Sequence, residues 1–260
     1  MRLDNYLVEK NYFPTRSKAQ IAIKNRNIYC DDKCITKNSY QVDETNNIEI
    51  QGEVLKYVSK GGLKLEKAIN NFNIDLKDKI MCDIGSSTGG FSDCAIENGV
   101  GKIYAIDVGN DQMDEKVKND KRVNLYENTD FRDIDENAFS DIEIVTIDVS
   151  FISVSKLLHK INQFRNIREI VCLVKPQFEC GMEVAHKYKG VVNSKQIHFE
   201  VISKVINAFK DIDFNVSGLT FSPIQGGSGN IEYLLYLTKN NLKYTYNIND
   251  VIKEAFNNFK

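Results

Sequence analysis

Four ionisable residues each end or follow a short apolar run: Asp83, Asp107, Asp148 and Lys175. Pro176 favours an extended backbone at Lys175, so that residue also reads as the end of a strand. Short apolar runs separated by helix-length segments are typical of a parallel sheet covered on both faces. Ligands of such sheets bind beyond the carboxyl ends of the strands. We therefore expect these side chains to meet at one edge and to form a site there.

The stretch "DIGSSTGGF", residues 83–91, predicts a ligand-binding turn between a strand and a helix. Gly85, Gly89 and Gly90 allow the backbone to pass close to a ligand. Asp107 stands where a carboxylate can accept hydrogen bonds from both hydroxyls of a ribose. An acid at position 83 would repel a pyrophosphate but suits an ammonium or sulfonium group. This favours S-adenosylmethionine over a dinucleotide such as NAD, while a turn that only joins strand to helix stays a third interpretation.

The predicted cofactor site draws on this turn, on the end of the next strand and on the segment "NTDFRDI". Thr129 and Asp130 are expected to border the adenine, although Asp130 could equally cap the next helix. The whole set comprises Asp83, Gly85, Ser86, Ser87, Gly89, Gly90, Phe91, Asp107, Val108, Thr129, Asp130 and Asp148.

The hydrophobic pattern predicts an α/β fold whose main domain has a seven-stranded, mostly parallel sheet. The expected strands are residues 79–84, 101–108, 122–126, 142–149, 169–176, 214–222 and 230–238. The expected helices are residues 62–72, 91–98, 153–163 and 194–210. Only a Gly/Ser-containing loop separates the last two strands, which predicts an antiparallel pair at one edge of the sheet.

The first 40 residues are rich in lysine and arginine, although the whole chain has a formal net charge of −2. Two short helices, at 2–10 and 15–25, and strands near 27–32 and 47–50 predict a small separate α/β module. A basic module on an acidic remainder favours a polyanionic partner, although a solvated charged surface would look similar. The candidate RNA-binding residues are Arg2, Arg16, Lys18, Lys24 and Arg26.

This module resembles the S4 RNA-binding domain in the runs Arg2-Leu3-Asp4 and Thr15-Arg16-Ser17-Lys18-Ala19. Two glycines usual in that pattern are replaced by Arg26 and Asp32, at positions expected to need tight turns. Further on, the phrases "YVSKGGLKL", "DIGSSTGGF", "IDVSFIS", "LVKPQFE" and "GNIEYLLY" resemble the TlyA family of rRNA 2′-O-methyltransferases, relatives of the FtsJ-type RNA methyltransferases.

The resemblance implies three parts: an S4-like RNA-binding domain at 1–50, a linker at 51–59 and a Rossmann-like methyltransferase domain at 60–260. It implies S-adenosylmethionine as methyl donor and ribosomal RNA or ribosomal subunits as partner. The early Arg2-Leu3-Asp4 resembles the shorter form of the family, which is associated with a cytidine of 23S rRNA. Action on 16S rRNA as well stays open.

FtsJ-like enzymes use a Lys-Asp-Lys-Glu set, and the resemblance assigns these roles to Lys64, Asp148, Lys175 and Glu232. An antiparallel last strand would begin where its parallel neighbours end, which would bring Glu232 to Asp148 and Lys175. The implied reaction is displacement by a ribose 2′ oxygen at the methyl carbon of the sulfonium. Because two cations balance two anions, we expect Lys175 to orient the hydroxyl first and to accept its proton second, with Asp148 and Glu232 holding the lysines.

Other classes of function receive less support from the sequence. Six cysteines without a C-x-x-C pair predict reduced thiols and no metal site. No signal peptide or spanning segment is evident, so we expect a cytoplasmic protein, with a monomer favoured. Two alternatives remain open: an RNA-binding ribosome-assembly factor without methyl transfer, and a membrane-active, hemolysin-like protein.

Overall fold

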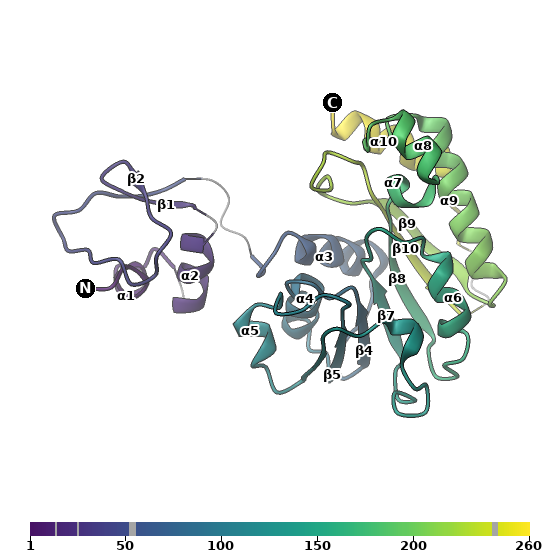
Figure 1. Ribbon diagram of the computed structural model, residues 1–260, viewed down its shortest axis with the longest axis horizontal. Coiled ribbons are helices and arrows are strands. Elements are labelled where there is room, and N and C mark those ends of the chain that lie inside the picture. Colours follow the sequence, from purple (N-terminus) through teal and green to yellow (C-terminus); the bar gives the residue numbers. More distant parts are fainter. Residues whose placement is uncertain (14, 25, 52–55, 241–243) are drawn as a thin grey trace. The chain divides into compact units, whose positions relative to one another are not determined.

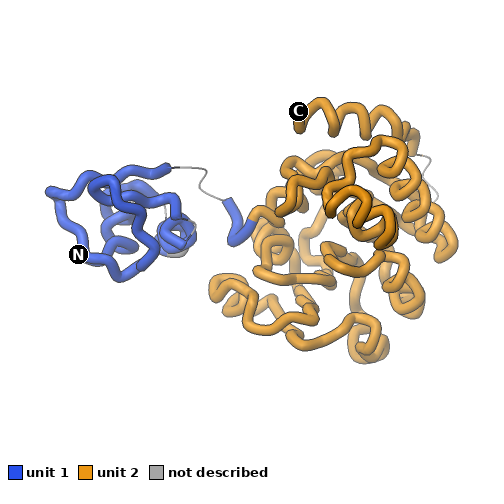
Figure 2. The backbone as a smooth tube through the Cα atoms, turned by 45° about the horizontal axis from the view of Figure 1, so that its top comes forward, with its two compact units in different colours: residues 1–59 blue, residues 60–260 orange. Residues whose placement is uncertain are grey.

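A computed structural model of the 260-residue chain describes residues 1–13, 15–24, 26–51, 56–240 and 244–260. The chain divides into two compact units, residues 1–59 and 60–260 (Figure 2). Within the predicted linker at 51–59, residues 52–55 lie outside the described part of the chain. Each unit has its own apolar core.

The first unit packs two helices against a small antiparallel sheet. Its helices are α1 (Leu3–Glu9) and α2 (Arg16–Lys24), and its strands are β1 (Ile28–Cys30), β2 (Lys33–Cys34) and β3 (Ile48–Ile50), in the order β2-β1-β3. Leu3, Leu7, Ala22, Ile23 and Ile28 are fully buried in its core. The two helices and the strands β1 and β3 confirm the sequence-based expectation, whereas β2 was not expected.

The two residues that replace the usual glycines of the S4 pattern both take left-handed backbone conformations. Arg26 has φ of 61° and Asp32 has φ of 63°. A left-handed conformation is uncommon outside glycine and favours short polar residues such as Asp. The expected tight turns are therefore confirmed, and at Arg26 the turn carries a conformational cost.

The second unit is built on a seven-stranded sheet in the order β6-β5-β4-β7-β8-β10-β9. Six strands run in the same direction, and β10 runs antiparallel to them. Its strands are β4 (Ile80–Ile84), β5 (Lys102–Ile106), β6 (Val123–Tyr126), β7 (Ile144–Ile147), β8 (Glu169–Val174), β9 (Asn215–Phe221) and β10 (Tyr233–Thr238). All seven lie within the runs that the sequence predicted. The expected antiparallel pair at one edge is confirmed: β9 and β10 pair there, with β9 outermost and β10 between β8 and β9.

Helices cover both faces of this sheet (Figure 1). They are α3 (Gly61–Phe72), α4 (Gly90–Glu97), α5 (Glu115–Lys118), α6 (Ser155–Ile161), α7 (Pro176–Glu179), α8 (Met182–Lys187), α9 (Lys195–Lys210) and α10 (Ile248–Asn258), with a 3₁₀ turn at Phe131–Asp133. The largest apolar cluster joins one face of the sheet to α6, α9 and α10, while α3 packs on α4 and on β9 and β10. The sequence predicted α3, α4, α6 and α9, but not the short α5, α7 and α8 or the C-terminal α10.

Four strands of the sheet end at the same edge. β4, β5, β7 and β8 are parallel, so the residues after them emerge together. β10 starts at this same edge, because its first residue, Tyr233, pairs with Val174, the last residue of β8. Glu232 therefore arrives beside Lys175 through strand register, although the two are far apart in sequence.

Candidate active site

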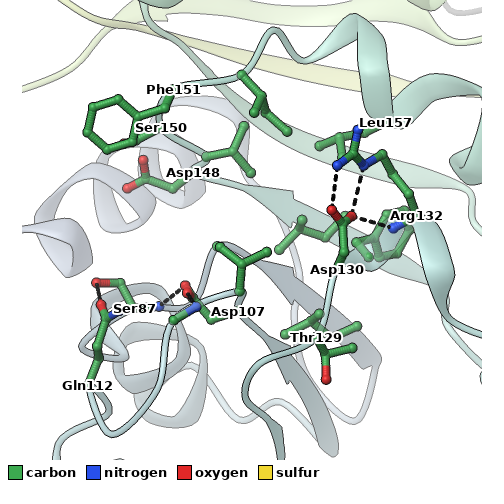
Figure 3. A pocket seen from close by; sticks show the side chains of 18 residues that line it. Ser87, Asp107, Gln112, Thr129, Asp130, Arg132, Asp148, Ser150, Phe151 and Leu157 are labelled. Carbon is green, nitrogen blue, oxygen red and sulfur yellow. Dashed lines mark hydrogen bonds and ion pairs between the residues drawn. The ribbon is translucent and has the colours of Figure 1, made fainter.

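A cavity of about 510 Å³ opens at this edge of the sheet (Figure 3). Its wall is made by the loops that follow four strands: Gly85 and Ser87 after β4, residues 107–109 and Gln112 after β5, residues 129–132 after β6, and residues 148–152 after β7. The volume lies in the range of small-molecule pockets, about 300–1,000 Å³.

The turn after β4 needs glycine for two physical reasons. Gly85 has φ of 80°, and a Cβ on it would lie 2.7 Å from the main-chain oxygen of Asp148. Gly89 has φ of 86°, and a Cβ there would lie 3.1 Å from Val117. The turn thus folds tightly onto the end of β7, and its backbone forms part of the cavity wall.

Asp107 is oriented by the main chain around it. One carboxylate oxygen accepts a hydrogen bond from Ser87 N at 2.8 Å and the other accepts one from Gly109 N at 2.6 Å (Figure 3). A Cβ on Gly109 would lie 1.8 Å from Nε2 of Gln112, so a side chain there would require the exposed Gln112 side chain to move. Each carboxylate oxygen retains a second acceptor position. The side chain is thus fixed in place with capacity left to bind hydroxyl groups.

Asp130 lies both at the start of the 3₁₀ turn and in the cavity wall. Its side chain accepts a hydrogen bond from Arg132 N at 2.9 Å, which caps the 3₁₀ turn, and it also lines the cavity. Arg132 pairs with the same carboxylate at 2.5 Å, and the hydrogen bond from Arg132 lowers the pKa of Asp130 (Figure 3). The neighbouring Thr129 also lines the cavity, and its main-chain N donates to Asp107 O at 2.9 Å.

Not every residue of the predicted cofactor set reaches the cavity wall. Gly85, Ser87, Asp107, Val108, Thr129, Asp130 and Asp148 line it, whereas Asp83, Ser86, Gly89, Gly90 and Phe91 do not. The last four belong to the turn or to the first residues of α4 and are buried behind the wall. Ser86 Oγ is buried there without a hydrogen-bond partner in the described part of the chain.

Asp83, which belongs to the predicted cofactor set, lies beneath the cavity wall and not in it. It is fully buried and accepts hydrogen bonds from Ser92 Oγ at 2.7 Å and from Thr146 Oγ1 at 2.8 Å. Burial raises the pKa of this carboxyl to about 6, and the negative charges of Asp148 and Asp107 act in the same direction against the two hydrogen bonds. Asp83 therefore acts on the cavity through its charge, from beneath the wall.

The four residues assigned by resemblance to the Lys-Asp-Lys-Glu set form one connected cluster. Lys64 Nζ lies 2.7 Å from Glu232 Oε2 and 3.9 Å from Asp148 Oδ2. Lys175 Nζ lies 2.6 Å from Asp148 Oδ1. Lys64, Lys175 and Glu232 are buried, with exposures of 8%, 8% and 2%. Asp148 is the member that also lines the cavity, so it joins the cluster to the predicted cofactor site.

Each member of the cluster comes from a different element. Lys64 lies on α3, whose apolar residues Leu65, Ala68 and Ile69 are buried against the sheet and α4. Asp148 and Lys175 follow β7 and β8, and Glu232 precedes β10. Two cations balance two anions in this buried cluster, which is the condition under which buried charges are tolerated.

Several residues of the cavity lie outside the predicted cofactor set. Ser150 accepts a hydrogen bond from Lys175 Nζ at 3.0 Å, and Phe151, with φ of 68°, is 89% exposed at the cavity (Figure 3). Gly109 and Gln112 complete the wall beside Asp107. Ser150 and Phe151 lie two and three positions after Asp148, an acid at the end of a predicted strand. This position is the sequence signal that points to them as site residues.

In the first unit, a buried acid gathers two of the five candidate RNA-binding residues. Asp4 is fully buried and accepts hydrogen bonds from Arg2 Nε at 3.0 Å, Arg16 Nε at 2.8 Å and Gln20 Nε2 at 2.8 Å. Burial opposes its ionisation, but these hydrogen bonds outweigh burial and hold the pKa of Asp4 well below its usual range.

The other three candidates lie on or just after α2. Lys24 and Arg26 are exposed and Lys18 is partly exposed. The side chains of Arg2 and Arg16 are 42% and 51% exposed, so their guanidinium groups remain accessible while Asp4 orients them. The unit thus presents basic side chains of which two are held in a fixed direction.

Neither a metal-binding cluster nor a membrane-spanning helix is found among the described residues. The described residues contain no group of three or more His, Cys, Asp or Glu side chains arranged to hold a metal ion. Across the same residues, no helix has the length and apolar character that a membrane span requires.

Comparison with known proteins gives consistent relationships along the chain. Residues 57–239 match the model of the FtsJ-like methyltransferase family and residues 1–48 match the S4 domain. The YqxC protein of Bacillus subtilis is 44% identical over 91% of this chain and 85% of its own length. The Campylobacter jejuni 23S rRNA (cytidine-2′-O)-methyltransferase TlyA is 32% identical over 92% of this chain and its whole length.

A solved structure from Streptococcus thermophilus, which carries a hemolysin name, is similar over the full length of this chain. It covers 100% of this chain and 96% of its own, with 37% identity and a TM-score of 0.76. The similarity therefore extends through both units and is not confined to the common sheet.

Proposed function

This chain belongs to the FtsJ-like methyltransferase family, in the TlyA branch with an S4 domain in front, and from that premise we propose that it is an S-adenosylmethionine-dependent rRNA 2′-O-methyltransferase. The observation that carries the proposal is the position of Asp148. It lines a nucleoside-sized cavity and at the same time pairs with both lysines of the buried Lys-Asp-Lys-Glu cluster.

The residues around the cavity fit S-adenosylmethionine. The tight turn at Gly85 would let the donor approach the backbone, and Asp107 would bind its ribose hydroxyls with the acceptor positions that Ser87 and Gly109 leave free. Thr129, Asp130 and Phe131 would border the adenine. The negative charges of Asp83, Asp107 and Asp148 favour a ligand with positive charge and disfavour a pyrophosphate.

The cluster can position a ribose hydroxyl and take up its proton. When bound, the donor supplies a methyl group that is activated by the positive charge of its sulfur. Lys175 Nζ forms an ion pair with Asp148 and donates a hydrogen bond to Ser150 Oγ, and these two contacts hold that nitrogen. In our proposal Lys175 holds the 2′ oxygen in line and accepts its proton once it is itself uncharged. Lys64 and Glu232 hold Asp148 and keep the site neutral.

We propose ribosomal RNA as substrate because the relatives and the first unit support it together. The Campylobacter relative is named for a cytidine of 23S rRNA, and this chain covers its whole length. The S4-like unit would bind RNA through Arg2, Arg16, Lys18, Lys24 and Arg26, by contacts that are mainly electrostatic. We expect a monomer that works in the cytoplasm, where this RNA is made, and 23S rRNA as the first substrate to test, with 16S rRNA second.

The direct test measures methyl transfer from labelled S-adenosylmethionine by the purified full chain. The substrates are ribosomal subunits and free rRNA from cells that lack this protein. We expect label in one or both rRNAs at a 2′-O position, and loss of the label in Lys175→Ala. RNA binding without methyl transfer would instead support an assembly factor, and leakage of liposomes by the purified chain would support membrane activity.

A further inference from the structure

One buried carboxylate at the catalytic edge has no part in the mechanism above. Glu179 ends α7, one helical turn after Lys175, and is 4% exposed. In the described part of the chain its carboxylate forms no ion pair with a lysine or arginine, and Lys204 Nζ contacts its main-chain oxygen, at 3.4 Å. Burying an acid without a cation is costly unless hydrogen bonds compensate it. The hydrogen bonds that the Glu179 carboxylate accepts must therefore compensate the cost of its burial.

Both oxygens of Glu179 bind the loop that follows Asp148. Oε2 accepts a hydrogen bond from Ser153 Oγ at 2.6 Å, and Oε1 accepts one from Val154 N at 2.7 Å. The segment 150–154 includes the cavity residues Ser150, Phe151 and Ile152. Glu179 thus fastens one end of this segment to α7.

The other end of the same segment is fastened by Lys175, which donates to Ser150 Oγ at 3.0 Å. Between the two contacts lies Phe151, whose φ of 68° is costly for a bulky residue. Its ring also lies against Phe178 of α7, with centroids 5.2 Å apart. A strained conformation persists only where its surroundings impose it, so the Glu179 contacts help to keep the segment 150–154 in place.

The position of Ser150 matters for Lys175. An amine nitrogen has three positions for protons or a lone pair. Lys175 Nζ uses one of them to donate to Ser150 Oγ at 3.0 Å, and it lies 2.6 Å from Asp148 Oδ1 in an ion pair that lacks hydrogen-bond geometry. The ion pair with Asp148 holds the nitrogen in place, and the hydrogen bond to Ser150 fixes its rotation and so the direction of the remaining positions. Without Ser150 only Asp148 would constrain the nitrogen, and its remaining positions could rotate away from the substrate hydroxyl.

From this chain of contacts we propose that Glu179 is a positioning residue of the methyl transfer, which acts by holding Ser150 against Lys175. The proposal rests on the proposed function, because it assigns a role within that reaction. Glu179 itself touches neither of the expected substrates. Its removal should therefore slow turnover far more than it weakens the binding of RNA or donor.

The experiment compares Glu179→Ala with Glu179→Gln in the full chain. Alanine removes both acceptors, and we expect kcat to fall about 100-fold, since a displacement near 1 Å can have that effect. KM for RNA and Kd for the donor should change much less than kcat. Glutamine keeps a carbonyl oxygen for Val154 N and offers its amide to Ser153 Oγ, so kcat should recover to within about threefold of wild type. Glu183→Ala, which removes an exposed acid on α8, is the matched control.

A double-mutant cycle with Ser150→Ala separates positioning from general destabilisation. If Glu179 acts through Ser150, the double variant loses no more kcat than the more affected single variant, whereas independent effects would multiply. Should Glu179→Ala fail to fold, Ser153→Ala removes one of the two contacts at a partly exposed residue, and about a tenfold fall in kcat is expected.

Three results would overturn this role. They are wild-type kcat in the alanine variants, a loss that appears in KM or donor affinity instead of kcat, and multiplicative effects in the cycle. A wild-type chain that transfers no methyl group to RNA would be recognised separately, because it overturns the proposed function and this role with it.

Discussion

Asp83 offers a test of how charge is arranged beneath the cavity. The change is Asp83→Asn, which keeps the shape of the side chain and removes its charge. The carboxyl is fully buried, and burial raises its pKa to about 6 from an ordinary value of 3.8. A difference of this size corresponds to about 3 kcal/mol of lost stability when the group is ionised.

The sign of the pH dependence follows from the raised pKa. Below pH about 4 the carboxyl is protonated in the folded and unfolded chain, and it costs nothing. Between pH about 4 and about 6 the folded chain binds the proton more tightly, so stability falls as pH rises. Above pH about 6 the whole cost is present. The asparagine variant avoids the cost, so its advantage appears only on the alkaline side.

We expect Asp83→Asn to raise the melting temperature of the second unit by about 5–10 °C at pH 8, with a much smaller gain at pH 4.5. The measurement is calorimetric unfolding of the full chain at both pH values, with the transition of the second unit identified by its shift on addition of S-adenosylmethionine. The matched control is Asp93→Asn. Asp93 is equally buried but lies 2.5 Å from Lys116 Nζ, so losing its charge should lower the melting temperature.

The same substitution should weaken binding of the positively charged donor. Asp83 interacts electrostatically with Asp107 and Asp148, both in the cavity wall, so its charge favours a cation there. In the wild type, donor affinity should rise as pH increases through about 6, and in Asp83→Asn this dependence should be lost. The reasoning is refuted if the variant melts at or below the wild-type temperature at pH 8, or if its stability gain is equal at both pH values.

Four further outcomes are expected. Lys175→Ala should lower kcat by about 100-fold or more and leave the calorimetric Kd for the donor nearly unchanged; an unchanged rate would remove that residue from the mechanism. Lys64→Met should destabilise the chain by about 3–5 kcal/mol in urea unfolding, because Glu232 keeps a buried charge, and adding Glu232→Gln should restore most of the loss. Gly85→Ala should abolish donor binding in calorimetry, because its Cβ would lie 2.7 Å from a main-chain oxygen. Normal affinity would contradict a role of the turn at Gly85 in binding the donor. Deletion of residues 1–50 should weaken RNA binding and flatten its dependence on salt in filter binding, while loss of donor binding as well would contradict the division of labour between the units.

The sequence alone determined the fold class, the strands of the large sheet and its longer helices α3, α4, α6 and α9. The alternating apolar runs identified all seven strands of the large sheet, since a buried strand needs a continuous apolar run and a helix-length segment must separate parallel neighbours. The glycines of the turn after β4 and the acids near the strand ends could also be recognised from the sequence, because each belongs to a pattern of a few neighbouring residues. The resemblance to the TlyA family supplied the four residues of the buried cluster. The hydrophobic periodicity alone does not predict that these four residues lie together.

Tertiary structure decided where those side chains point. The sequence pattern placed both Asp83 and Asp107 at strand ends, but Asp83 lies within β4 and Asp107 follows β5. Asp83 turns inward to Ser92 and Thr146, whereas Asp107 faces the cavity. The insertion of β10 between β8 and β9 depends on pairing across the whole sheet, and this register brings Glu232 to Lys64. Contacts between residues distant in sequence are set by packing and hydrogen bonding, which a local pattern does not encode.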